Sequence, residues 1–193
     1  MKVLFFGGTR FVGKALVSSL LSKGHEIFVF TRGNLPVPKN INHVKGDRSD
    51  DEDLKKLSGH SFDLIVDSSG RKLEDTQRFL KFSGLPSFRF IYISSAGVYD
   101  NTQLFPVSEE SSIDLESRHI GKAKTEHWLK TEGIPFTSFR PTYIYGPGNY
   151  NPIEKWFFDR ITNGRSIPVP FDGQTITQLG HVSDLAEAIS KSL

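Results

Sequence analysis

The strongest constraint on the fold lies in residues 1–24, where a short apolar run leads through a glycine-rich turn into an amphipathic stretch. Val3–Phe6 is typical of a buried strand, and the apolar residues from Phe11 to Lys23 recur at helical spacing. A glycine-rich turn between a strand and a helix directs backbone N–H groups and the helix dipole at one point, where a pyrophosphate can bind. The alternative is an ordinary strand-to-helix turn without a ligand, but the position after the first strand favours the phosphate site.

Strand-like and helical patterns alternate along most of the chain. The expected strands are 26–30, a short one at Val44, 62–67, 88–94 and 136–140, and the expected helices are 50–57, 72–82 and 118–131. This alternation predicts an α/β fold with a doubly wound parallel sheet. Prolines, glycines and aromatics in 141–180 predict an irregular region with one helix over 153–163, and a last helix follows over 181–193.

Composition excludes several classes of protein. The chain has 193 residues, a formal net charge of +2 and no cysteine, which excludes a disulfide scaffold, a cysteine-ligated zinc site and a thiol nucleophile. The near-neutral charge gives no general electrostatic case for nucleic acid or membrane, and the six histidines share no ligand spacing with carboxylates, so we expect no metal. No apolar run approaches the roughly 20 residues of a membrane span. With no targeting peptide ahead of the first strand, we expect a cytoplasmic protein, or a plastid one only if a transit peptide has been removed.

The end of the second strand bears on which dinucleotide would bind. An acidic residue there would grip the ribose 2′-hydroxyl of NAD, but this strand runs into Thr31-Arg32. A guanidinium suits the 2′-phosphate of NADP, so we expect NADP to be favoured over NAD. The alternative is that Arg32 is a solvated loop residue.

Several motifs together resemble a known superfamily. They are Gly7-Gly8-Thr9-Arg10-Phe11-Val12-Gly13, Gly46-Asp47-Arg48, Ser94-Ser95-Ala96-Gly97-Val98-Tyr99, Arg140-Pro141 and Tyr145-Gly146-Pro147. This set resembles the extended or atypical short-chain dehydrogenase/reductase superfamily, which includes the NAD-dependent epimerases and dehydratases. Ser117–Lys122 and Tyr143–Pro152 more narrowly resemble the chloroplast stem-loop-binding protein family and its bacterial relatives. The resemblance implies a Rossmann dinucleotide-binding domain over 1–145. Over 146–193 it implies the start of a shortened substrate-domain region, ending in a helix that returns to the Rossmann core.

The resemblance also implies which residues hold the cofactor, in order along the sheet. The pyrophosphate would be lined by Gly7, Thr9, Arg10, Phe11, Val12 and Gly13, and the adenosine ribose by Arg32. The adenine would lie beside Asp47 and Arg48. The nicotinamide ribose would be lined by Ser68, Ser69, Gly70 and Lys122, and the nicotinamide by Pro141 and Thr142. Asp47 would accept a hydrogen bond from the adenine amino group. Taken singly, Asp47 is as readily a turn former and 68–70 a polar strand end, but their joint order favours the site.

The catalytic residues depart from the family pattern. The superfamily uses a tyrosine, a lysine four residues later and a serine on the preceding strand; Ser95 and Lys122 match, but Arg118 stands in the tyrosine position. A guanidinium stays protonated and cannot serve as the base. If 118–131 is helical, His119 points about 100° away from that position, which makes it a poor substitute. Tyr99 and Tyr143 are expected near the pocket as alternative phenols. The sequence therefore leaves open whether the chain is an enzyme.

Two main functions compete. The first is association with structured RNA, by binding or endonucleolytic processing, as the resemblance implies. Its candidate contacts are the basic residues Arg10, Lys14, Arg32, Lys39, Lys45, Arg48, Arg118, Lys122, Lys124 and Lys130 and the aromatics Tyr143, Tyr145, Tyr150, Trp156, Phe157 and Phe158. Such aromatics more often belong to a core, and such lysines to a solvated face. The second function is an NAD(P)-dependent epimerase, dehydratase or reductase acting on a nucleotide-sugar or similar small molecule. A redox-sensing role is a third interpretation, without support in the sequence. The helices over 72–82 and 118–131 match those that pair in superfamily dimers, so a homodimer is left open.

Overall fold

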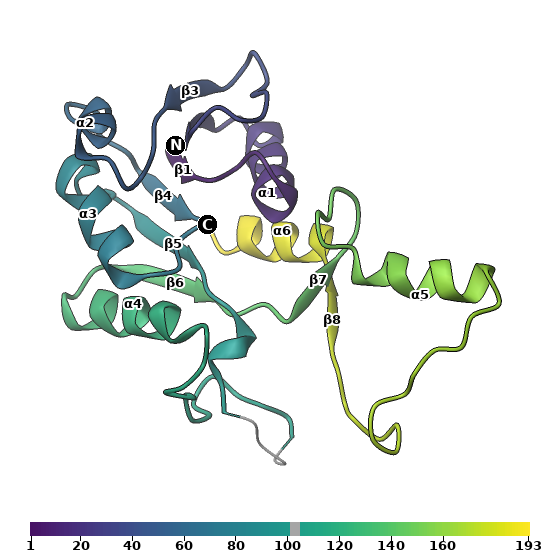
Figure 1. The fold of residues 1–193 in the computed structure, drawn as a ribbon. Helices are drawn as coiled ribbons and strands as arrows, with labels where there is room; N and C mark the ends of the chain where they lie inside the picture. The colour runs from purple at the N-terminus through teal and green to yellow at the C-terminus, as the bar shows by residue number, and fades with distance from the viewer. Residues whose placement is uncertain (101–104) are drawn as a thin grey trace.

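A computed structural model describes residues 1–100 and 105–193, and its centre is a six-stranded sheet in the order β3-β2-β1-β4-β5-β6 (Figure 1). The strands are β1 (Lys2–Phe6), β2 (Glu26–Thr31), β3 (Asn42–Lys45), β4 (Leu64–Asp67), β5 (Arg89–Ile93) and β6 (Phe136–Phe139), and all neighbouring pairs are parallel. The helices between them are α1 (Phe11–Ser22), α2 (Asp51–Leu54), α3 (Leu73–Ser83) and α4 (Ile120–Thr131). The predicted α/β fold with a doubly wound parallel sheet is confirmed.

Successive residues of β1 point to opposite faces of the sheet, and both faces are buried. Val3 and Phe5 pack with Leu16 of α1 in one hydrophobic cluster, while Leu4 and Phe6 belong to a second cluster on the other face. The second cluster is completed by buried side chains of α2, α3 and α4. This explains why the segments of the four inner strands, β1, β2, β4 and β5, are nearly continuous apolar runs rather than alternating ones.

The order of the strands fixes where a ligand can bind. The chain moves from β1 outward to β2 and β3 on one side, and from β4 to β6 on the other. The strand order therefore reverses at β1, and a crevice opens outside the carboxyl ends of β1 and β4. The loops that follow all six strands meet at this edge of the sheet.

The region after β6 contains more regular structure than expected. Two short strands, β7 (Tyr143–Tyr145) and β8 (Leu179–His181), pair in parallel, although the composition there predicted an irregular segment with a single helix. Their pairing joins segments far apart in the sequence, and three-residue strands leave no periodic signal to detect. The expected helix is present as α5 (Ile153–Thr162).

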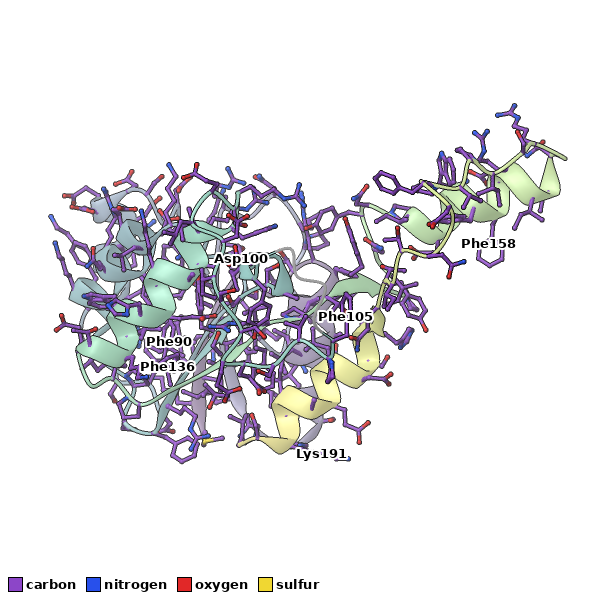
Figure 2. The ribbon with its side chains drawn as sticks, turned by 90° about the horizontal axis from the view of Figure 1, so that it is seen from below. Phe90, Asp100, Phe105, Phe136, Phe158 and Lys191 are labelled. Carbon is purple, nitrogen blue, oxygen red and sulfur yellow. The ribbon has the colours of Figure 1, made fainter. Side chains whose placement is uncertain are left out.

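The last part of the chain returns to the sheet after an excursion. In Figure 1, α5 and the loop after it stand away from the sheet, whereas α6 (Val182–Lys191) lies beside α1. Ala186 and Ile189 of α6 belong to the same buried cluster as α1. Figure 2 shows Phe158 of α5 far from Phe90 and Phe136, which are register partners on β5 and β6. The division of the chain at residue 145 stays a prediction.

No helix in the part of the chain that the structure describes is both long and apolar enough to cross a bilayer.

Candidate functional site

A groove of about 1170 Å³ runs along the carboxyl edge of the sheet and is lined by the loops that follow β1 to β6. All the cofactor-binding and catalytic residues that the sequence analysis proposed lie in its lining. They are Gly7, Thr9, Arg10, Phe11, Val12, Gly13, Arg32, Asp47, Arg48, Ser68, Ser69, Gly70, Ser95, Lys122, Pro141 and Thr142. The fold thus brings residues from seven separate segments to one surface.

The turn between β1 and α1 is tightly built and leaves the start of the helix without a side-chain cap. Gly7 has a φ of 102°, and a Cβ there would lie 2.4 Å from Ser68 Oγ. A Cβ on Gly13 would lie 2.7 Å from the backbone nitrogen of Gly8, so only glycine allows this close approach. Arg10 is the N-cap residue and its side chain forms no capping hydrogen bond, and the first turn of α1 has no acidic residue. The positive end of the helix dipole therefore faces the groove uncompensated by these side chains.

At the end of β3, Asp47 is held in a tight local turn. Its Oδ1 accepts hydrogen bonds from the backbone N–H and the hydroxyl of Ser49, at 2.9 and 2.6 Å. These bonds hold the pKa of Asp47 below its ordinary value, and the nearby guanidinium of Arg32 acts in the same direction. Within the described residues Oδ2 has no hydrogen-bond partner, so it is free to accept one from a ligand. The turn-forming role and the ligand-binding role are thus compatible.

A buried ion pair joins the loop after β3 to the end of β4, and the sequence analysis did not foresee it. Arg48 donates from NH1 to Asp67 Oδ1 at 2.9 Å and from NH2 to Oδ2 at 2.8 Å, and NH1 also reaches Ser69 Oγ at 2.7 Å. Asp67 is fully buried and accepts further bonds from the backbone N–H groups of Ser69 and Gly70. Burial alone would raise the pKa of Asp67, but Arg48 and these bonds lower it overall. The pair therefore fixes the 68–70 turn and holds the guanidinium of Arg48 beneath the groove. Its only sequence signal is an aspartate at the end of the apolar run Leu64–Val66.

Ser95 and Lys122 lie in the part of the groove beyond β4. Ser95 Oγ accepts a hydrogen bond from the backbone N–H of Gly97 at 3.1 Å, and among residues 1–100 and 105–193 its own hydroxyl hydrogen has no acceptor. Lys122 Nζ donates to the carbonyl of Ile93 at 2.5 Å, and burial lowers the pKa of this lysine. The carbonyl of Pro141 accepts from Ala96 N–H at 2.9 Å, which connects the loops after β5 and β6.

The start of α4 differs from the expectation, and the predicted orientation of His119 is therefore wrong. The helix begins at Ile120 rather than at residue 118, so Arg118 and His119 lie in the preceding turn. The rotation of about 100° per helical residue, which predicted that His119 points away from the tyrosine position, therefore does not apply to it. His119 lines the groove with Arg118, whose Nε donates to His119 Nε2 at 3.0 Å. A Cβ on Gly97 would lie 2.6 Å from the His119 ring and 3.3 Å from Ser95 Oγ. The imidazole and the serine hydroxyl thus flank the same point.

Tyr99 and Tyr143, the two tyrosines expected near the pocket as alternative phenols, do not lie in the groove lining. The hydroxyl of Tyr99 accepts a hydrogen bond from Arg140 at 2.8 Å, and Arg140 also pairs with the buried carboxylate of Glu126. Tyr143 is on β7 and is 56% exposed. The groove is lined by Tyr150 instead, which meets the ring of Phe11 edge-on at 6.4 Å between centroids.

The candidate RNA contacts separate into two groups. Of the basic residues proposed from the sequence, Arg10, Arg32, Arg48, Arg118 and Lys122 line the groove, whereas Lys14, Lys39, Lys45, Lys124 and Lys130 do not. Arg71 also lines the groove and was not proposed. The expectation that the aromatics are core residues is wrong for α5, because none of its residues is buried. No cluster of three or more metal-ligating side chains occurs among residues 1–100 and 105–193.

Comparison with known proteins agrees with this geometry. The model of the NAD dependent epimerase/dehydratase family matches residues 3–81 and 73–193. The chain is 46% identical, over 97% of its length and 53% of the relative's, to the chloroplast stem-loop binding protein of 41 kDa b of Arabidopsis thaliana. It is 26% identical to a 3-beta-hydroxysteroid dehydrogenase of Mycolicibacterium neoaurum, over 81% of the chain and 51% of the relative. The chain thus spans about half the length of the curated relatives it matches.

A solved structure supports the fold independently. The UDP-glucose 4-epimerase of Thermus thermophilus in complex with NAD superposes with a TM-score of 0.80 at 20% identity, covering 100% of this chain and 74% of that one. At this identity the likeness concerns the fold alone. Because the family model matches nearly the whole chain, the protein belongs to the NAD-dependent epimerase/dehydratase family, as its motifs predicted.

Proposed function

We propose that the groove binds a nicotinamide dinucleotide, with NADP favoured over NAD. The observation that carries this proposal is the order of the lining along the sheet edge. By the strand order, the uncapped start of α1 after β1 lies between the Arg32 and Asp47 end, after β2 and β3, and the Ser95 and Lys122 end, beside β5. An extended dinucleotide needs an anion site in its middle and polar partners at both ends, and this groove offers them in that order. Arg32 is exposed and lies beside the expected adenosine ribose, where it suits a 2′-phosphate.

The residues present fit such a cofactor. The free Oδ2 of Asp47 suits the adenine amino group, and the glycines at 7 and 13 let a pyrophosphate approach the backbone. When bound, the nicotinamide would supply hydride transfer. At that end of the groove, Lys122 is anchored to the carbonyl of Ile93 and Ser95 presents a hydroxyl. Arg118 cannot accept a proton, so the proton transfer that the superfamily assigns to tyrosine is not available at this position.

We further propose that the biological role is association with structured RNA rather than ordinary dehydrogenase or epimerase chemistry. The 46%-identical relative is named a stem-loop binding protein, and Arg118 stands at the position where the resemblance implies a tyrosine. The groove adds cations, and α5 adds exposed aromatics that can stack on unpaired bases, such as Trp156 and Phe158 at 43% and 67% exposure.

The test of this role is a fluorescence-anisotropy titration of a labelled RNA stem-loop at fixed salt, with and without saturating NADP. An unstructured RNA of the same length and composition is the matched control. We expect tighter binding of the stem-loop, with an affinity that NADP changes because both ligands use the groove. Absence of stem-loop binding at physiological salt would contradict the RNA role while leaving cofactor binding intact.

One observation favours a second candidate, an NAD(P)-dependent enzyme acting on a nucleotide-sugar or similar small molecule. Ser95, Lys122 and the ring of His119 all line the groove, so an imidazole stands near the family serine. A panel of sugar nucleotides incubated with NADP, monitored by nicotinamide absorbance, tests this candidate. Turnover that His119→Gln abolishes would support it, and a panel without turnover would reject it for those substrates.

A further inference from the structure

The groove lining carries a large excess of positive charge. Within the described residues, its cationic side chains are Arg10, Arg32, Arg48, Arg71, Arg118 and Lys122, and its one carboxylate is Asp47. The whole chain has a formal net charge of only +2, so positive charge is concentrated at this surface. Such a groove favours polyanionic ligands.

Half of these cations have an anionic partner or are expected beside the phosphates of the cofactor. Arg48 is neutralised by the buried carboxylate of Asp67. Arg10 and Arg32 belong to the turn and the ribose end, where the phosphates of NADP are expected. Arg71 and Arg118 have no such place, and Lys122 is expected beside the nicotinamide ribose, which carries no charge; we call these three the distal cations.

The distal cations come from two segments that lie against each other. The carbonyl oxygen of Arg71 is 2.2 Å from the position that a Cβ on Gly121 would take, so the loop after β4 packs directly on the first turn of α4. Arg118 precedes that turn and Lys122 lies within it. All three surround His119: burial first, and then the charges of Arg118, Lys122 and Arg71, lower the pKa of its imidazole.

These charges are not compensated within the described part of the chain. No carboxylate of residues 1–100 or 105–193 forms an ion pair with a distal cation. The two acidic residues whose charges reach Lys122 are Asp67 and Glu126. Each is already paired, Asp67 with Arg48 and Glu126 with Arg140. The distal cations therefore form a site that lacks its anion.

The cofactor does not supply that anion. Arg71 follows β4, which neighbours β1, and Lys122 binds the carbonyl of Ile93 on β5, two strands from β1. Strands are spaced about 4.8 Å apart, so the cluster lies on the order of 5–10 Å across the sheet from the pyrophosphate turn. The nicotinamide expected at this end is uncharged when reduced and positively charged when oxidised, so it leaves the distal cations unpaired.

We propose that Arg71, Arg118 and Lys122 bind a phosphate group of a second ligand at the nicotinamide end of the groove. Guanidinium pairs suit the oxygens of a phosphate monoester or diester, because each can offer two parallel N–H donors. This phosphate site rests on the proposed function, because it assumes that the pyrophosphate of the dinucleotide binds at the turn formed by residues 7–13.

The direct test is calorimetric titration with ribose 5-phosphate in saturating NADP, with ribose as the phosphate-free control. The double variant Arg71→Gln/Arg118→Gln removes two distal cations, and Lys81→Gln on α3 is the matched control, since Lys81 is exposed, outside the groove lining and not among the candidate RNA contacts. We expect the double variant to weaken binding at least about tenfold, because charge-assisted hydrogen bonds are lost, and Lys81→Gln to leave it unchanged. Equal binding by the double variant and the wild type would overturn the proposal.

A second arm identifies the source of the phosphate. A single-stranded RNA with hydroxyl ends offers only diesters, whereas ribose 5-phosphate offers only a monoester. If the double variant binds only the RNA more weakly than the wild type does, the site is assigned to a nucleic-acid backbone. If it binds only ribose 5-phosphate more weakly, the site is assigned to a small molecule. Either result supports the proposed phosphate site. If the wild type binds neither probe saturably, the proposal fails.

A spectroscopic readout separates this proposal from cofactor binding. In NMR titrations without NADP, bound inorganic phosphate is expected to raise the pKa of His119, because it offsets the cations around the imidazole. The exposed ring of His127 on α4 serves as the internal control, with no expected response to phosphate. If the titration of the His119 imidazole signal is the same with and without phosphate, the proposed phosphate site is contradicted. NADPH binding, measured separately by fluorescence, shows whether the cofactor proposal fails on its own.

Discussion

At the scale of the residue, the ion pair of Arg48 and Asp67 shows how one buried contact shapes the site. Asp67 is completely buried, while the side chain of Arg48 is 17% exposed and packs over the rings of Phe6 and Phe79. The Asp67 carboxylate accepts two hydrogen bonds from the guanidinium of Arg48 and two from backbone N–H groups, and these bonds fix the conformation of the turn from Asp67 to Gly70. Loss of either partner would leave a buried charge without compensation.

Asp67→Asn is therefore expected to lower the free energy of unfolding by about 3–5 kcal/mol, measured by urea denaturation at neutral pH. Asp51→Asn, which breaks the exposed pair with Arg78, is the control and should cost at most about 1 kcal/mol. The pKa of Asp67 is lowered in the folded protein, so its stabilisation is complete above the ordinary carboxyl pKa of about 4 and is lost as pH falls through the lower folded value. The decrease in the free energy of unfolding at low pH that comes from protonation of Asp67 should be absent in the variant. Equal stability of the variant and the wild type at neutral pH would contradict the role given to the buried ion pair.

The glycine turn offers a second test at this scale. A Cβ on Gly13 would meet the backbone nitrogen of Gly8 at 2.7 Å, and backbone atoms cannot move aside as a flexible side chain can. Gly13→Ala should cost about 1–3 kcal/mol by overpacking and also weaken dinucleotide binding. Gly180→Ala is the control, because a Cβ there has 3.9 Å to its nearest neighbour. A calorimetric scan in which both variants unfold alike would show that the turn is not tightly packed.

At the scale of the element, α5 is the helix least supported by the fold. None of its residues is buried, and Ile153, Trp156, Phe157, Phe158 and Ile161 are all at least 40% exposed. Since the helix contributes little apolar burial, its aromatic side chains should matter for contacts with other molecules more than for folding.

Phe158→Ser should accordingly change the free energy of unfolding by no more than about 0.5 kcal/mol. Phe79→Ala in α3, where the ring is fully buried and stacked on Phe6, should cost about 3–5 kcal/mol. Both values come from chemical denaturation followed by circular dichroism. A large loss of stability in the Phe158 variant would mean that α5 packs against the rest of the protein.

Helices and strands with a clear hydrophobic pattern could be predicted from the sequence, and features that depend on tertiary contacts could not. The segments that became β1, α1 and β4 carry continuous apolar runs or helical spacing, and the sequence located them within a residue or two. The start of α4 was misplaced because Arg118 and His119 continue a helical composition, although both lie in the turn before Ile120, where His119 packs against Gly97. The pairing of β7 with β8, and of Arg48 with Asp67, depends on contacts distant in sequence that no local pattern reveals.

At the scale of the whole molecule, the fold collects residues from six loops into one cationic groove at the switch point of the sheet. The resemblance supplied the order of the candidate residues, and the structure brings all of them to one surface. Sequence alone did not identify Arg71 as part of the lining, because nothing in its neighbourhood marks it as close to α4. We propose that this groove binds a nicotinamide dinucleotide.

The most direct test is calorimetric titration of NADP and NAD into the wild type, Arg32→Gln and Lys39→Gln at one salt concentration. Lys39 is exposed, near Arg32 in sequence and outside the lining, so it controls for the loss of one charge. We predict that both dinucleotides bind the wild type, that NADP binds more tightly, and that Arg32→Gln alone removes about a tenfold advantage of NADP. If neither dinucleotide binds the wild type saturably, the groove is not a cofactor site and the account is contradicted.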